Sequence, residues 1–184
     1  MAGAAAVLLT SMDYAKRHGL DQPVRVRAIS TVTPTFPQTV IDMPLLSTDP
    51  SSGPVGSTFK QSIGAAAYEE AGIGPEEVSL AEVYDLSTAL ELDWIEDLAL
   101  CKQGEAEQLL RAGDTTIGGR IPVNPSGGLA CFGEAVPAQA LAQVCEVTWQ
   151  LRGQATGRQV EDAQVGITAN QGLFGHGSSV ILSR

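Results

Sequence analysis

The chain has 184 residues, of which 43% are hydrophobic and 17% are charged, which is enough for one globular domain with a core. Its net charge of −10 and its scattered basic residues exclude a nucleic-acid site and a basic membrane-binding surface. No apolar stretch is as long as a membrane helix, the start resembles no secretion signal, and the three cysteines (Cys101, Cys131 and Cys145) have neither metal-ligand spacing nor an even-numbered disulfide pattern. A cytoplasmic protein without a metal is expected.

The first elements are predicted from patterns of small, alternating and turn-forming residues. Residues 3–9 (GAAAVLL) are small and apolar, which is typical of a buried strand. Ser11 predicts the cap of a short helix over residues 12–18. Residues 24–31 (VRVRAIST) alternate as a half-exposed strand does, and residues 33–56 are rich in proline, serine and glycine. The latter segment predicts a long loop of the kind that lines sites or interfaces.

Strands and helices alternate through the rest of the chain. The expected elements are a helix over 57–71, a strand over 78–84, helices over 85–100 and 105–111, a long helix over 134–151, and strands over 163–169 and 178–182. This alternation predicts an α/β fold in which five strands form a mixed sheet covered by helices on both faces.

Several segments together resemble thiolases of the sterol-carrier or lipid-transfer type. The clearest is GGRIPVNPSGG at 118–128, followed directly by a helix, which resembles the family's substrate loop. Residues 81–105 resemble the strand and helix that bear an HDCF or NEAF signature. The start, GAAAVLLTS, resembles the last strand of the family's amino-terminal half, and ANQGLFGHGSSVIL resembles its closing glycine-rich hairpin. The resemblance covers essentially the whole chain.

The resemblance also implies an absent half. A thiolase has two similar halves, and residues 1–22 would be the last strand and helix of the first, with 23–184 as the carboxyl-terminal domain. The other half would supply the nucleophilic cysteine and most of the coenzyme A loop. The implied partners are therefore the thiolase amino-terminal half and a second copy in a homodimer of the full enzyme. No cofactor is expected, because the coenzyme A thioester is the substrate.

The family's chemical positions have changed in this chain. A thiolase needs an acyl-accepting cysteine, a histidine that activates it, and a second base. The family's GHP sequence reads GEA at 133–135, and its HDCF reads YDLS at 84–87. The cysteine or HN pair of the closing hairpin reads AN at 169–170. Ordinary thiolase chemistry is therefore not expected.

Three residues are predicted to be catalytic instead. Tyr84 ends a predicted strand, where open α/β sheets bind ligands, and a phenol with a pKa of about 10 suits an acid or an assisted base. Asp85 follows it and would orient it or cap the next helix. Glu134 falls at the amino end of the predicted long helix, which favours a carboxylate. Each residue also has a plain structural alternative, as a packed tyrosine, a helix cap or a first-turn acid.

Five further residues are predicted to bind the substrate. Asn124 and Ser126 are expected to shape the NPSGG loop first and to contact the substrate second. Gly127 and Gly128 would permit a close approach to the backbone. His176 would line the pocket or hydrogen-bond a loop.

The resemblance points to one branch of the family. This branch contains lyases, the aldolases of steroid catabolism such as cholesterol degradation. They cut the side chain of a steroid acyl-CoA, release propionyl-CoA and a ketone, use tyrosines, and work with an OB-fold domain of an acyl-CoA hydratase. Tyr84 is predicted to match one such tyrosine. Two alternatives stay open, an acetyl-CoA acyltransferase (thiolase) of lipid degradation and a non-catalytic acyl-CoA or lipid carrier. The lost GHP histidine counts against the acyltransferase.

Overall fold

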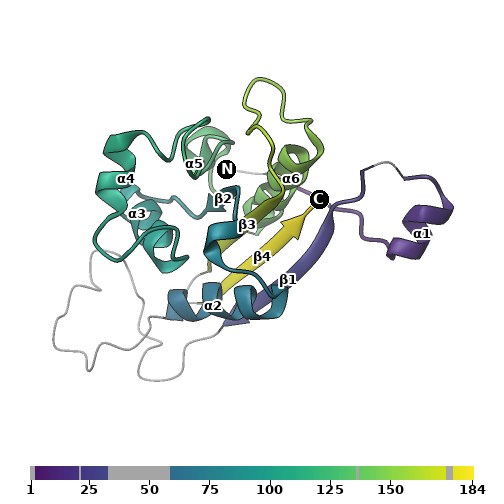
Figure 1. The fold of residues 1–184 in the computed structure, drawn as a ribbon, viewed down its shortest axis with the longest axis horizontal. Helices are drawn as coiled ribbons and strands as arrows, with labels where there is room; N and C mark the ends of the chain where they lie inside the picture. The colour runs from purple at the N-terminus through teal and green to yellow at the C-terminus, as the bar shows by residue number, and fades with distance from the viewer. Residues whose placement is uncertain (1–2, 21, 33–58, 136, 173–175) are drawn as a thin grey trace.

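A sheet with helices on both faces forms the centre of the computed structural model, which describes residues 3–20, 22–32, 59–135, 137–172 and 176–184 (Figure 1). Side chains of the first long helix are described from residue 63 on. The loop predicted over residues 33–56 lies outside the described residues. Within the described part of the chain, no helix is both long and apolar enough to cross a bilayer.

The described strands form one mixed sheet in the order β1-β4-β3-β2. The strands are β1 (Arg25–Val32), β2 (Leu80–Val83), β3 (Val165–Gln171) and β4 (Gly177–Ser183). β4 pairs antiparallel with β1 and β3, whereas β2 and β3 are parallel, with Val83 opposite Ala169. The mixed sheet is confirmed. The carboxyl ends of β2 and β3 lie at the same edge, where parallel strands of α/β proteins commonly place ligands.

The sheet has four described strands, so the prediction of five is wrong. Residues 3–10 form no strand, and Leu8 and Leu9 are 89% and 72% exposed. A strand needs a neighbour to take its backbone hydrogen bonds, and this segment pairs with none of the four described strands. The helix after it is as predicted: α1 spans Met12–Arg17, and the Ser11 side chain accepts a hydrogen bond from the Tyr14 N–H at 3.1 Å.

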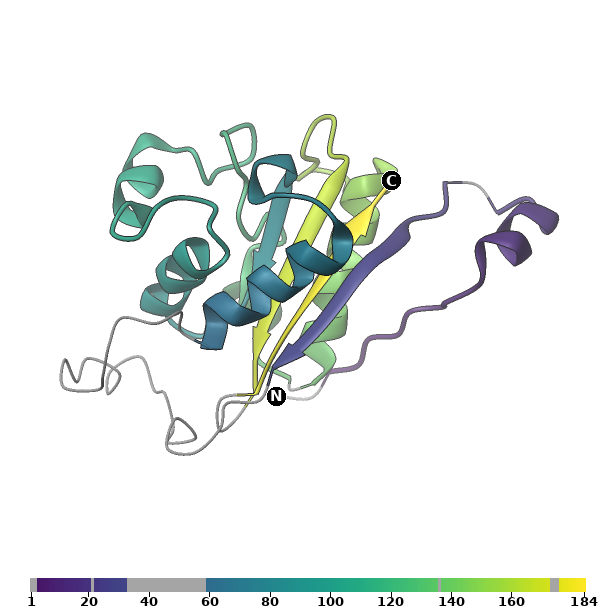
Figure 2. The same ribbon diagram turned by 60° about the horizontal axis from the view of Figure 1, so that its bottom comes forward.

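Helices cover both faces of the sheet, as predicted. The helical segments after β1 are α2 (Phe59–Ala71), the 3-10 turn η1 (Pro75–Glu77), α3 (Thr88–Asp97), α4 (Ala106–Ala112), α5 (Gly128–Phe132) and α6 (Ala138–Arg152), of which α2, α3 and α6 pack against the sheet. In Figure 2, α2 crosses in front of the sheet and α6 lies behind it. The larger core fills the α2 and α3 side, where Ile63, Trp94 and Ile181 are fully buried.

The layer between α6 and the sheet is unusually polar. The first two turns of α6 bury Gln139 and Gln143, and only its last two turns bury Val147 and Leu151 beside Leu80 of β2. The buried face therefore begins with amides, and the apolar residues Ala140 and Val144 are only half-buried. The buried amides lie at the end of α6 that faces the carboxyl ends of β2 and β3.

Candidate active site

Tyr84 and Glu134 are brought together by the fold. The Tyr84 backbone N–H donates to the Ala169 carbonyl at 2.9 Å, which holds the residue against the end of β3. Its hydroxyl donates to Glu134 Oε1 at 2.5 Å. Tyr84 is only 6% exposed, whereas Glu134 is exposed. A buried phenol therefore contacts a carboxylate that solvent or a second molecule can reach.

Glu134 does not lie at the start of the long helix, so that prediction is wrong. α5 ends at Phe132 and is followed by its C-cap Gly133, which has a φ of 78°, and α6 begins only at Ala138. Pro137 immediately precedes α6, and a proline disfavours helical backbone at the residue before it. Glu134 therefore belongs to the connecting loop, and its carboxylate accepts a hydrogen bond from the Tyr84 hydroxyl and not from the N–H groups of a helix.

Gln139 is a third member of this group that the sequence reading missed. Burial, the hydrogen bond to Glu134 and the charges of Glu134 and Asp85 raise the pKa of Tyr84, while a side-chain hydrogen bond from Gln139 lowers it. Tyr84 therefore stays protonated at neutral pH and is suited to giving or relaying a proton. The signal in the sequence was the polar stripe of α6, because Gln139, Gln143, Glu146 and Gln150 recur at helical spacing.

Asp85 caps a helix other than the one that follows it. Its Oδ1 accepts a hydrogen bond from the Leu129 N–H of α5 at 2.9 Å. The next helix, α3, is capped by Ser87, whose Oγ accepts from the Leu90 N–H at 3.3 Å. Asp85 therefore links the end of β2, next to Tyr84, to the start of α5.

The NPSGG segment forms a turn held against the outer edge of β2. The Gly127 N–H donates to the Asn124 carbonyl at 2.8 Å, with Pro125 in the second position that β-turns favour. Asn124 has a φ of 49°, its N–H donates to the Ala81 carbonyl at 2.8 Å, and its Oδ1 accepts from the Val83 N–H at 2.7 Å. The Asn124 amide thus extends the pairing of β2, and a substrate contact for it stays a prediction.

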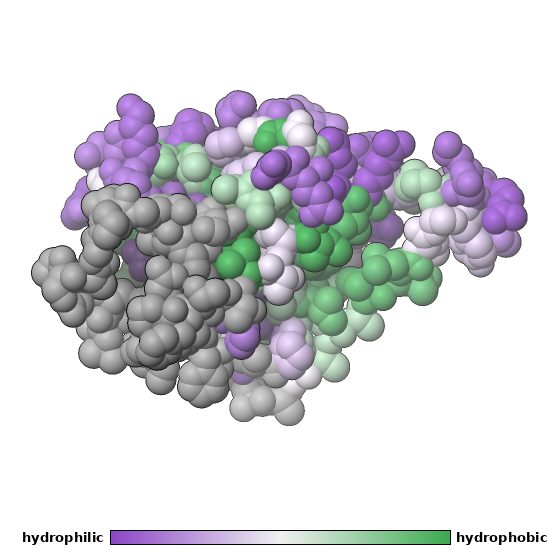
Figure 3. Space-filling view, turned by 90° about the horizontal axis from the view of Figure 1, so that it is seen from below, coloured by the Kyte–Doolittle hydropathy of each residue, from purple (hydrophilic) through white to green (hydrophobic). Residues whose placement is uncertain are grey.

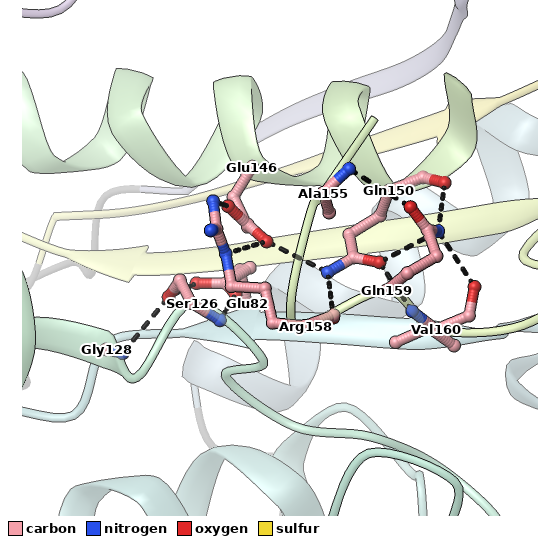
Figure 4. Close-up of polar contacts among 9 residues, drawn as sticks. All are labelled: Glu82, Ser126, Gly128, Glu146, Gln150, Ala155, Arg158, Gln159 and Val160. Carbon is pink, nitrogen blue, oxygen red and sulfur yellow. Dashed lines mark hydrogen bonds and ion pairs between the residues drawn. The ribbon is translucent and has the colours of Figure 1, made fainter. Parts of the chain in front are cut away.

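The buried carboxyl of Glu82 holds Ser126 of the NPSGG loop (Figure 4). Glu82 is fully buried, and its two oxygens accept from the Ser126 N–H at 3.0 Å and from the Ser126 hydroxyl at 2.7 Å. The Gly128 N–H in turn donates to Ser126 Oγ at 3.0 Å. Burial above all, helped by the charges of Glu146 and Asp85, raises the pKa of Glu82 to about 8, against the lowering effect of the Ser126 hydrogen bonds.

The neighbouring cation is already paired. Arg158 forms two hydrogen bonds with Glu146, at 3.0 and 2.7 Å, and Gln150 donates to Glu146 Oε1 at 2.9 Å (Figure 4). Arg158 therefore pairs directly with Glu146, and the partner of the Glu82 carboxyl is Ser126. Ser126, like Asn124, uses its polar atoms within the protein, and its substrate contact also stays a prediction.

Both glycines of the loop have positive φ, at 87° for Gly127 and 62° for Gly128. A Cβ on Gly127 would overlap Cys131 Sγ, and a Cβ on Gly128 would overlap the Asp85 carboxylate. The close approach that these glycines permit is therefore to the protein's own side chains.

His176 is exposed in the β3–β4 hairpin, at the Tyr84 edge of the sheet, and its substrate contact stays a prediction.

Gly128→Ala should destabilise the chain by roughly 2 kcal/mol, because it adds backbone strain and displaces Asp85 from its cap on α5. Gly153→Ala is a matched control, since Gly153 has a φ of 69° with nothing within 4 Å of its added Cβ. It should cost about 1 kcal/mol. Urea unfolding of the three proteins measures both values, and equal losses would contradict the proposed contact with Asp85.

Two hollows in the described part of the chain lie away from Tyr84 and Glu134. One, of about 770 Å³, is lined by side chains of α2, α3 and the segment after α3. The other, of about 920 Å³, lies between residues 6–10, β1 and α6. Neither lining includes Tyr84 or Glu134.

Residues 51–184 match the family model described as "Thiolase C-terminal domain-like". The chain belongs to this family. The match extends from the region before α2 to the end of β4, so it includes Tyr84, the NPSGG loop and Glu134. It confirms the resemblance predicted from the sequence.

Several relatives of this thiolase-like chain agree with that placement. Sterol carrier protein 2 of Rattus norvegicus is 37% identical over 174 residues, covering 94% of this chain and 30% of the relative. An acetyl-CoA acetyltransferase of Methanothermobacter thermautotrophicus is 37% identical over 185 residues, covering 99% and 45%. A solved structure named "Ltp2-ChsH2(DUF35) aldolase" matches with a TM-score of 0.70 and 25% identity, covering 88% and 39%. The chain therefore spans less than half the length of these relatives.

Proposed function

We propose that this chain is the carboxyl-terminal half of a thiolase-like aldolase. The reaction is the retro-aldol cleavage of a β-hydroxyacyl-CoA with a steroid side chain, which releases propionyl-CoA and a ketosteroid. The observation that carries the proposal is the hydrogen bond from the Tyr84 hydroxyl to Glu134 at the carboxyl edge of the sheet. The structural match to a protein named as an aldolase supports it.

The Tyr84–Glu134 pair can move the proton that this reaction requires. Tyr84 accepts the proton of the substrate's β-hydroxyl while it passes its own proton to Glu134, along the hydrogen bond already formed. The β-carbon becomes a ketone as the bond between the α- and β-carbons breaks, and its electron pair forms the thioester enolate. The enolate then takes at its α-carbon the proton held by Glu134, returned through Tyr84, so the pair is restored and no water or oxidant is consumed.

The raised pKa of Tyr84 fits this relay. A phenol that is buried and lies beside two acids does not ionise by itself near neutral pH. It therefore needs a neighbour that takes its proton, and Glu134 is in contact with it. Neither residue is a nucleophile suited to an acyl-enzyme, which agrees with the absence of the thiolase histidine at 133–135.

The acyltransferase is the second candidate, favoured by the relative named acetyl-CoA acetyltransferase. Under this reading, acyl transfer would be carried out by residues of the other half. A non-catalytic lipid or acyl-CoA carrier is the third, since other relatives are named sterol carrier protein 2. The acyltransferase and the carrier both predict that no catalytic step depends on Tyr84 or Glu134.

The enzyme as proposed has further subunits. Residues 1–22 would complete the amino-terminal half, with 23–184 as the carboxyl-terminal domain. Val7, Leu8 and Leu9 are 40%, 89% and 72% exposed, and Figure 3 shows hydrophobic surface along the segment that leads to α1. The amino-terminal half would cover this surface. A DUF35 partner is named in the aldolase neighbour, and we propose an OB-fold partner of this kind here.

The test uses the assembled enzyme, meaning this chain with the thiolase amino-terminal half and the OB-fold partner. Incubation with a β-hydroxy steroid acyl-CoA should release equal amounts of propionyl-CoA and ketosteroid, measured by mass spectrometry. This chain alone should be inactive, because half a site cannot hold the substrate. Thiolysis of acetoacetyl-CoA without C–C cleavage of the steroid thioester would favour the acyltransferase, and neither activity would favour the carrier.

A further inference from the structure

Two buried amides next to Tyr84 have hydrogen-bonding capacity that the protein does not use. Asn170, at the end of β3, and Gln143, on α6, are 8% and 0% exposed. The Asn170 amide nitrogen donates to Gln143 Oε1. Gln143 Nε2 and Asn170 Oδ1 have no partner within the structure.

The hydrogen bond between the two amides does not depend on how they are oriented. The nitrogen and oxygen of an amide are assigned from the hydrogen-bond network, so both side chains can be turned together. One amide would then donate to the other as before. In the orientation of the structure, the Gln143 NH₂ group and the Asn170 oxygen are left without a partner. Buried polar groups are rarely left in this state, and those that are commonly have a functional explanation.

The pair lies within one helical turn of the Tyr84 group. Gln139, whose side chain hydrogen-bonds to Tyr84, precedes Gln143 by one turn of α6. Asn170 follows Ala169, whose carbonyl accepts the Tyr84 N–H. Asn170 and Gln143 therefore belong to the two elements, the end of β3 and the start of α6, that also contact Tyr84.

We infer that the Asn170–Gln143 pair binds the thioester carbonyl oxygen of the substrate and stabilises it as an enolate. This inference rests on the proposed function. As the bond between the α- and β-carbons breaks, negative charge moves onto the thioester oxygen, and positioned N–H donors stabilise such charge. The charges closest to Tyr84 are the acids Glu134 and Asp85, so a neutral amide donor is suited to a site that already holds carboxylates.

The enolate can be tested separately from C–C cleavage. The assembled enzyme, incubated with propionyl-CoA in D₂O, should exchange the α-hydrogens of the propionyl group for deuterium, which mass spectrometry measures. Gln143→Met keeps a similar volume and removes the amide, and it should slow exchange by about 100-fold or more. Asn170→Leu should do the same, so that the test stands if one variant fails to fold.

Gln150→Met is the matched control. Gln150 is also a buried glutamine of α6, but its amide is fully engaged with Glu146, Arg158 and Val160. This variant should lose more stability than Gln143→Met, yet exchange at a rate within about threefold of the unsubstituted enzyme. A loss of exchange that follows stability across the three variants would overturn the inference, because it would show a purely structural role.

The outcomes separate the inference from the proposed function. Exchange that depends on Asn170 and Gln143 without any cleavage of the steroid thioester would support the inference and overturn the aldolase. Cleavage and exchange that are both insensitive to the two substitutions would overturn the inference and leave the aldolase standing. No exchange by the unsubstituted enzyme would also overturn the inference.

Discussion

Tyr84→Phe should lower kcat for retro-aldol cleavage by about 10²–10⁴-fold, the range by which a positioned acid or base accelerates proton transfer. The substitution removes one oxygen and leaves the ring in its buried position, 6% exposed. Glu134 is exposed, so water can replace the lost hydrogen bond, and the unfolding free energy should change by no more than about 1 kcal/mol. KM should change little, because the hydroxyl acts in the proton transfer.

Tyr68→Phe provides a matched control for this prediction. The Tyr68 hydroxyl, on α2, is buried and donates to the Leu98 carbonyl at 2.9 Å, whereas the Tyr84 hydroxyl donates to Glu134. Its removal leaves a buried carbonyl without that donor and should cost about 1–3 kcal/mol of stability, with kcat unchanged. Steady-state kinetics and thermal melting of both variants make the comparison. Equal kcat values for Tyr84→Phe and the unsubstituted enzyme would remove Tyr84 from the mechanism.

The sequence predicted the fold where the signal was local and failed where it was not. The strand over residues 24–31 and the helix after Ser11 depend on alternation and on a cap, both of which neighbouring residues determine. Residues 3–9 have a strand-like composition, but a strand also requires a partner strand, which no local pattern specifies. Glu134 was placed at the start of the helix predicted over residues 134–151, whereas the helix begins at Ala138, after Pro137.

The candidate site was predicted only in part, because some of its residues have a local sequence signal and others depend on tertiary contacts. Tyr84 and Glu134 were found because each occupies a position where the thiolase signature differs, but their contact across 50 residues came from the fold. Gln139 was missed because a glutamine on a helix usually faces solvent. Glu82 was missed because it lies within a strand of apolar residues, where its burial against Ser126 is a tertiary contact.

Glu82 should make the protein less stable as the pH rises. Burial raises its pKa to about 8, from the ordinary value of 4.5, so the folded state binds this proton more tightly than the unfolded state does. The resulting stabilisation is complete below about pH 4.5 and is lost as the pH rises through 8. A displacement of this size corresponds to about 5 kcal/mol at most, and structural relaxation around the ionised carboxyl reduces it.

Glu82→Gln should remove this dependence. A glutamine has the same shape, its oxygen can accept from the Ser126 N–H, and its NH₂ can donate to Ser126 Oγ. The charged groups that face this position, Asp85 after β2 and the paired Glu146 and Arg158, are the same in both proteins. The variant should therefore gain stability over the unsubstituted protein as the pH rises, by more than about 2 kcal/mol between pH 5 and pH 8.

Urea unfolding of the assembled enzyme at pH 5, 6, 7 and 8 measures this difference. Glu107→Gln is the control, because Glu107 is 65% exposed in a surface ion pair with Arg111, and its effect should be small and nearly independent of pH over this range. A Glu82→Gln difference that is equally flat would show that Glu82 is ionised throughout. If the difference grows instead, ionisation of Glu82 weakens the support of the Ser126–Gly128 loop, and α5 with its Asp85 cap should loosen beside Tyr84 as the pH rises.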